Sequence, residues 1–68
     1  MPTFTTNVDD AGGNILYVGE AQPGSATSNA VWRIKRINTS NDDVVTNWAD
    51  GNANFDNIWD DRLSLNYI

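Results

Sequence analysis

Hydrophobic residues in this chain gather in short segments that are separated by polar, turn-forming stretches. Residues 15–21 are rich in strand-favouring side chains and are bounded by glycine, asparagine and proline. In residues 30–37, Trp32 and Ile34 alternate with basic side chains, as in a strand with one buried face. The pattern predicts a strand in each segment, with Trp32 and Ile34 facing the core.

The alternation in the second segment loses its phase towards the end. Arg36 and Ile37 are adjacent, so a regular strand would turn Ile37 to the outer face. We predict a β-bulge near Lys35 and Arg36, because one extra residue would return Ile37 to the core side.

Two further strands are predicted towards the C-terminus. Residues 44–49 alternate in the same way, and the tryptophan marks one face as the better candidate for the core. Residues 63–68 alternate between apolar and polar side chains, which predicts a fourth strand. The expected core face of the third strand is Val44, Thr46 and Trp48 rather than Val45, Asn47 and Ala49.

Residues 48–62 combine a turn with a helical pattern. Asp50, Gly51 and Asn52 form a strong turn signal, since glycine accepts positive φ and the polar side chains bond to nearby backbone groups. A short helical turn is expected after them and before the C-terminal strand. The residues at the spacing of one helix face are Phe55, Ile58, Trp59, Arg62 and Leu63.

These elements predict an all-β fold, a small antiparallel β-sheet domain of about four strands with one short helical turn. Residues 15–68 are expected to form this single domain. Residues 1–14 are polar and rich in turn formers, so we expect an N-terminal arm or loop there. The predicted core consists of Leu16, Val18, Trp32, Ile34, Ile37, Trp48, Phe55, Ile58, Trp59, Leu63 and Leu65.

The composition limits the chemistry that the chain can perform. Its 68 residues form one small core and include neither cysteine nor histidine. Disulfides and thiolate metal sites are therefore excluded, and the commonest general base is missing. Assembly with other chains, or a cation held by oxygen ligands, remains as a source of extra stability.

The charge pattern argues against nucleic acid as a partner, because the net charge is −5 and only four residues are basic. Three of these four, Arg33, Lys35 and Arg36, form a cluster. The cluster is interpreted either as an anion-binding patch or as a charged outer face that pairs with the excess carboxylates. An acidic protein favours the second interpretation.

The loop after the third strand has the spacing of a calcium site. Its candidate ligands are Asp50, Asn52, Asn54, Asp56 and Asp61. Phe55 stands where a calcium loop needs glycine, and Asp61 is shorter than the usual glutamate. The alternative is a turn-rich loop in which these side chains cap backbone groups. We favour that alternative and expect no cofactor.

Catalysis is not expected. Asp60 and Asp61 are adjacent and Asp56 lies one helical turn earlier, so two carboxylates could act as acid and base. A chain of this length has little room for the cleft that such a site needs. The plainer expectation is that these carboxylates pair with Arg62 or with the basic strand.

The aromatic residues also have two interpretations. The three tryptophans could form a platform for stacking sugars, or the large aromatic side chains could anchor the core and the contacts between subunits. We favour anchoring and expect a homo-oligomer, since the aromatic supply exceeds what a small monomer easily buries. The expected anchors are Trp32, Trp48, Phe55, Trp59, Tyr17 and Tyr67.

Membrane insertion is not expected. The N-terminal residues have neither the basic start nor the apolar run of an export signal. No segment approaches the roughly 20 apolar residues that cross a bilayer.

Five motifs spread over residues 15–67 carry a resemblance to a known family. They are Tyr17-Val18-Gly19-Glu20-Ala21, Gly24-Ser25-Ala26-Thr27-Ser28, Ala30-Val31-Trp32-Arg33-Ile34, Ala49-Asp50-Gly51-Asn52 and Phe55-Asp56-Asn57-Ile58-Trp59-Asp60-Asp61-Arg62. Together they resemble small structural proteins of tailed bacteriophages. The resemblance implies a non-enzymatic virion component of the head, neck, tail or fibre. Such a subunit would assemble in the host cytoplasm with copies of itself and other virion proteins. The alternative is a calcium-stabilised or carbohydrate-binding β-module.

Overall fold

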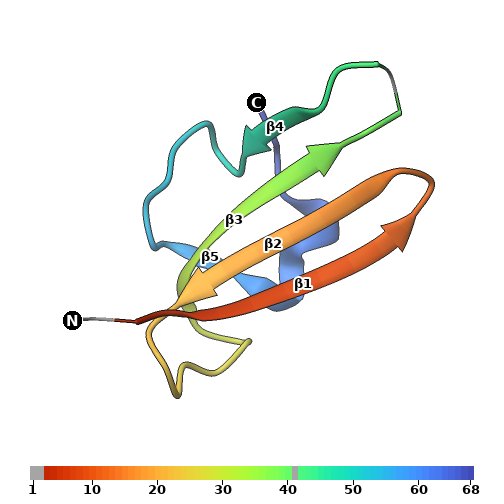
Figure 1. Ribbon diagram of the computed structural model, residues 1–68. Helices are drawn as coiled ribbons and strands as arrows, with labels where there is room; N and C mark the ends of the chain where they lie inside the picture. The colour runs from red at the N-terminus through yellow and green to blue at the C-terminus, as the bar shows by residue number, and fades with distance from the viewer. Residues whose placement is uncertain (1–2, 41) are drawn as a thin grey trace.

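The computed structural model describes residues 3–40 and 42–68, which form an antiparallel sheet with a short helix on one side (Figure 1). Four strands run in the order β1-β2-β3-β4, and a fifth short strand, β5, pairs with β3. The predicted all-β fold class is confirmed. The elements are β1 (Thr5–Gly12), β2 (Ile15–Ala21), β3 (Ala30–Asn38), β4 (Val45–Trp48), β5 (Asn57–Ile58) and the 3₁₀ helix η1 (Trp59–Ser64).

β1 and β2 form a hairpin, which corrects the expectation of an N-terminal arm or loop. Thr5 lies opposite Ala21 and the pairing continues to the turn, while residues 1 and 2 lie outside the described residues. The turn has three successive residues with positive φ, Gly12, Gly13 and Asn14. Glycine and asparagine are the residues that adopt this conformation most readily. The strand escaped prediction because its inward side chains are polar.

The pairing of β2 with β3 is regular where a bulge was predicted. The register between the two strands runs without a shift along residues 33–38 of β3. The prediction of a bulge near Lys35 and Arg36 is therefore wrong. Arg36 lies on the same face of the sheet as Trp32, and Ile37 lies on the opposite face.

The side chains of β4 point in the opposite directions to those predicted from the sequence. Trp48 lies directly opposite Lys35 of β3, so both side chains are on the same side of the sheet. This side is opposite to the one that carries Trp32 and Ile34. The prediction that Val44, Thr46 and Trp48 face the core is therefore wrong, and Ala49 is the buried residue of this segment.

The C-terminal segment forms η1 and an isolated bridge instead of the predicted fourth strand. η1 begins at Trp59, and beyond its end Tyr67 makes a single antiparallel bridge with Ala49. A helical turn is therefore present before the C-terminus, as predicted. Its apolar face differs, however, because Phe55 and Ile58 precede the helix.

The core lies between η1 and one face of the sheet, and two tryptophans form its centre. The ring centroids of Trp32 and Trp59 are 5.9 Å apart, and Trp32 Nε1 donates a hydrogen bond to the Ala26 carbonyl oxygen at 3.0 Å. Residues Tyr17 and Leu65 pack against this core. Its buried members are Ala21, Trp32, Ile34, Ala49, Trp59 and Tyr67.

Several predicted core residues lie elsewhere. Leu63 is 70% exposed on η1, and Phe55 is 41% exposed in the loop before β5. Ile58 is half-buried in β5. Cross-strand pairing places the others on the sheet face opposite η1, where they are half-buried, and these are Leu16, Val18, Ile37 and Trp48.

Gly19 of β2 allows η1 to lie close to the sheet. A Cβ atom at this position would lie 2.6 Å from Cζ3 of Trp59 and 3.2 Å from Cε3 of Trp32. Carbon atoms in contact are normally about 3.5–4.0 Å apart, so a side chain here would displace the tryptophans. The indole of Trp59 therefore occupies the space that a larger residue in β2 would fill.

An ion pair ties β1 to η1. Arg62 Nε donates to Asp9 Oδ2 at 2.9 Å, and the Arg62 guanidinium carbon lies 4.7 Å from the centroid of the Trp59 ring. The polar inner side of β1 is therefore matched by a cation on the covering layer.

Tyr67 closes the core near the C-terminus. Its hydroxyl donates a hydrogen bond to the Arg62 carbonyl oxygen at 2.8 Å. Burial, together with the nearby Tyr17, raises the pKa of Tyr67 to about 12. The neutral phenol is therefore the form that the fold accommodates.

We predict that Gly19→Ala lowers the free energy of unfolding by about 2–3 kcal/mol, because the added methyl group overlaps Trp59. Urea unfolding followed by tryptophan fluorescence measures the change. Gly13→Ala is the matched control, with no atom within 4 Å of the added Cβ and only the positive φ to oppose it, at about 1–2 kcal/mol. In a Trp59→Phe background the Gly19→Ala effect should shrink. An unchanged effect in that background would show that Trp59 does not limit the space.

We also predict that stability falls as the pH rises from about 10 to about 12. The unfolded chain loses the Tyr67 proton near pH 10, whereas the folded chain holds it to about 12. The stabilising contribution is therefore complete below pH 10 and is lost towards pH 12, by roughly 2–3 kcal/mol. Urea unfolding of wild type and Tyr67→Phe across this pH range measures it, because the two proteins differ only in the phenol of Tyr67. Parallel pH profiles would contradict the assignment.

Candidate functional site

The sheet has one covered face and one open face. η1 lies on the covered side (Figure 1), and the alternation of side chains along each strand sends the other half of the residues to the opposite side. We call this opposite side the open face. Its members are Thr6, Val8 and Asp10 of β1, Leu16, Val18 and Glu20 of β2, Arg33, Lys35 and Ile37 of β3, and Thr46 and Trp48 of β4.

An aromatic cluster, formed by Phe4, Phe55, Trp48 and Arg33, occupies the open face. The rings of Phe4 and Phe55 are stacked, with centroids 5.4 Å apart and an interplanar angle of 28°. The Arg33 guanidinium carbon lies 5.2 Å from the Phe4 centroid, 4.8 Å from that of Phe55 and 5.9 Å from Trp48. One cation therefore contacts three rings that come from distant parts of the chain.

Arg33 is held in this position by an ion pair. Its Nε donates to Glu20 Oε1 on the neighbouring strand at 2.9 Å, and both side chains are about a quarter exposed, at 27% and 24%. The two residues are direct cross-strand partners, which fixes the pair on the open face. Lys35 lies beside it with its Nζ 5.3 Å from the Trp48 centroid. The open face thus combines apolar and aromatic side chains with two basic residues of β3, and it also carries Asp10 and Glu20.

Phe4 was not among the expected aromatic anchors, because it belongs to the segment expected to be an arm. A period of two connects Phe4 with Val8 across Thr6, and this alternation continues the pattern of β1. The pattern is the signal that could have identified Phe4. The approach of Phe55 has no such signal, because a loop brings it to the sheet.

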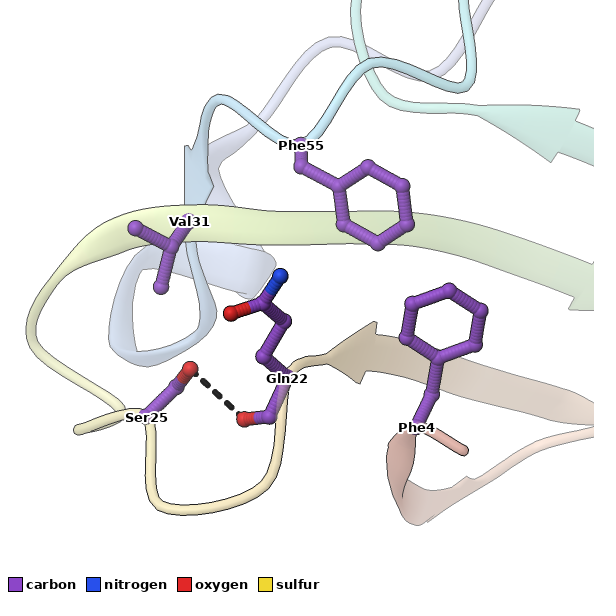
Figure 2. Close-up of a pocket in the computed structure, with 5 residues that line it drawn as sticks. All are labelled: Phe4, Gln22, Ser25, Val31 and Phe55. Carbon is purple, nitrogen blue, oxygen red and sulfur yellow. Dashed lines mark hydrogen bonds between the residues drawn. The ribbon is translucent and has the colours of Figure 1, made fainter. Parts of the chain in front are cut away.

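A pocket of about 350 Å³ adjoins the aromatic cluster. Figure 2 shows the rings of Phe4 and Phe55 along one side, Val31 and Ser25 along the other, and the Gln22 side chain extending between them. Ser25 Oγ donates to the Gln22 carbonyl oxygen at 2.7 Å. The lining residues are all uncharged, so the pocket suits an apolar group bordered by a hydrogen-bonding amide.

The expected aromatic anchors divide between the two faces. The core contains Trp32, Trp59 and Tyr67, and Tyr17 packs against it, with centroids of the two tyrosine rings 5.5 Å apart. The open face holds the remaining two, Trp48 and Phe55. The three tryptophans therefore do not form one platform for stacking sugars.

The three basic residues of β3 do not form one patch either. Arg36 points to the covered face, where its guanidinium carbon lies 5.3 Å from the Tyr67 ring centroid. Arg33 and Lys35 point to the open face, and Arg33 is paired with Glu20. The charged-face interpretation therefore holds for Arg33 and Lys35 but not for Arg36, and the cluster that an anion would require is divided between the two faces.

The loop weighed as a calcium site contains hydrogen bonds among its own residues. Asn52 Oδ1 accepts from the Asn54 backbone N–H at 3.0 Å, and Asp56 Oδ1 accepts from Asn57 Nδ2 at 3.3 Å. Across residues 3–40 and 42–68, no three acidic side chains gather in a group that could hold a metal ion. The loop thus has the features of the turn-rich alternative.

The candidate catalytic carboxylates are exposed to solvent at and just before the start of η1. Asp60 and Asp61 are exposed, as is Asp56 in the preceding loop. Arg62, which was their expected partner, instead binds Asp9. The pocket by the aromatic cluster contains none of these residues.

Comparisons with protein-family models, with curated proteins and with solved structures find no match for this chain. In the described part of the chain, no helix has the length and apolar character needed to span a bilayer. The open face, with its aromatic cluster and pocket, is therefore identified from geometry alone.

We predict that Arg33→Met destabilises the fold by about 1 kcal/mol, because it removes the cation that contacts three rings while keeping an apolar stem. Glu20→Gln is the matched control, since it removes the charge of the ion pair and leaves the rings unchanged. We expect its effect to be smaller and to vanish at high salt. Urea unfolding at low and high salt measures both. Equal losses that both vanish in salt would assign the effect to the ion pair alone.

Proposed function

We propose that the protein is a non-enzymatic structural subunit that assembles with copies of itself through the open face. The exposed aromatic cluster carries the proposal, because Phe4 and Phe55 remain 42% and 41% exposed although they stack on each other and on Arg33. Aromatic residues and arginine are enriched at the centres of protein interfaces. A preformed stack of these residues loses little conformational entropy when a partner covers it.

The size of the chain supports the same conclusion. Among the described residues, six apolar and aromatic side chains are buried in the core, and a domain of this length gains few kcal/mol from one core. Covering the open face would bury half-exposed apolar residues of three strands, including Val18 and Ile37. Association is a source of stability that needs neither disulfide nor metal.

We further propose that the assembly is part of a phage-like particle. The support is the resemblance of residues 15–67 to small structural proteins of tailed bacteriophages, whose subunits are repeated many times in a particle. Other virion proteins are then additional partners, and the virion, assembled in the host cytoplasm, is the location. Head decoration, neck, tail and fibre are all compatible with a small subunit of this kind.

Carbohydrate binding is the second candidate function, and the pocket favours it. Two aromatic rings stand beside the Gln22 amide and the Ser25 hydroxyl, and sugars bind through ring contacts together with hydrogen bonds. This candidate needs a single folded subunit, whereas the structural role needs several. The solution mass therefore separates the two.

Light scattering across a concentration series tests the proposal. We predict a mass that is a multiple of 7.5 kDa and is indifferent to calcium or a chelator. Phe55→Ser should weaken association at least tenfold, because truncating an aromatic residue at an interface centre commonly costs more than about 1.4 kcal/mol. Val44→Ser is the matched control, since Val44 is 65% exposed and lies before β4. A wild-type protein that remains a monomer at all concentrations would contradict the structural role.

A further inference from the structure

The pocket beside the aromatic cluster has the properties of a receptor for an apolar side chain. Its lining residues are uncharged, its volume is about 350 Å³, and two phenylalanine rings form one wall (Figure 2). We infer that this pocket receives Leu63 of a second copy, so that subunits join head to tail. The inference rests on the proposed structural role and specifies how the subunits meet.

Leu63 is the apolar residue that η1 leaves uncovered. It is 70% exposed, more than any other large hydrophobic residue in the described part of the chain. Both of its neighbours in η1 are fixed, because the Arg62 carbonyl accepts from Tyr67 Oη at 2.8 Å and Ser64 Oγ donates to the Asp61 carbonyl at 2.9 Å. Leu63 is thus presented on a rigid turn, which lowers the entropy cost of docking.

The charges around Leu63 complement those beside the pocket. Asp60 and Asp61 are exposed in η1, and both ion pairs of the described residues use other carboxylates. On the open face, Lys35 lies beside the aromatic cluster, with its Nζ 5.3 Å from the Trp48 centroid, whereas Arg33 is already paired with Glu20. Copies of a chain with a net charge of −5 repel one another overall, so a local match of opposite charges selects this orientation.

The two halves of the contact lie on opposite sides of the sheet. η1 covers one face, whereas Gln22 and Val31 of the pocket share the alternation of the open face. Leu63 therefore cannot enter the pocket of its own chain, because the sheet lies between them. Each subunit presents one Leu63 and one pocket, and a contact between unlike surfaces repeats to form a ring or a stack.

Other exposed apolar residues fit the pocket less well. Val8 belongs to the open face itself, and Ile68 lies against the turn at Gly51. Val44 is exposed and follows two acidic residues, but it is smaller and lies outside the strands and the helix. Leu63 combines exposure, length and a rigid base, and Val44 serves as the comparison in the test.

A mixing experiment with two complementary variants tests the inference. Leu63→Ser keeps an intact pocket and loses the inserted side chain, whereas Phe55→Ser keeps Leu63 and loses a wall of the pocket. At a concentration where wild type assembles, we expect each variant alone to be monomeric, with at least tenfold weaker association. Their equimolar mixture should form a 1:1 heterodimer and stop there, because one intact contact remains. Circular dichroism confirms that each variant is folded.

The possible outcomes separate the two proposals. If wild type assembles and Leu63→Ser assembles equally well, the head-to-tail contact is overturned while the structural role stands. If both variants remain monomers after mixing, Leu63 does not insert into the pocket that Phe55 borders, and the inference is also overturned. A monomeric wild type overturns the structural role itself. Disruption by Val44→Ser but not by Leu63→Ser would place Val44 in the pocket instead.

Discussion

The close approach of the Trp59 indole to the backbone of Gly19 is the contact on which the rest of the fold depends. It lets a short helix cover the sheet, because the ring occupies the space left by the missing side chain and packs against Trp32 with an interplanar angle of 36°. Arg62 and Tyr67 then pack around it, and the first strand is fixed through Asp9. One covering layer of this size serves one face only, so the other face remains open.

The sequence predicts the parts of the fold in which side chains alternate without interruption. The strand at 15–21 and the facing of Trp32 and Ile34 follow from this pattern, and the fold class follows from the number of such segments. β1 was missed, because the side chains on its inner side are polar and are satisfied by distant residues such as Arg62, and only the outward Phe4 and Val8 mark its alternation. The facing of Trp48 depends on its register with Lys35, which local alternation does not contain. In the last segment the burial of Trp59 overrides the alternation of residues 63–68.

The candidate site shows the same division between local and distant information. Alternation places Arg33 and Lys35 together on the outer face, so this basic pair was within reach of sequence reasoning. The aromatic partners of Arg33, Phe4 and Phe55, lie 51 positions apart in the chain. Phe4 comes directly before β1, and Phe55 comes from the loop before β5. The open face therefore contains aromatic rings in contact with a cation, and this contact becomes visible only when the strands are assembled.

The ion pair between Asp9 and Arg62 joins residues that are 53 positions apart in the chain. Contacts of such long range form only after a large loop has closed, which slows folding. The tie between the first strand and the covering helix therefore depends on this loop closure. Under head-to-tail assembly, a chain that has not completed this step also lacks the rigid base that presents Leu63. A growing assembly would then add fully folded subunits in preference to incompletely folded ones, without the help of a separate chaperone.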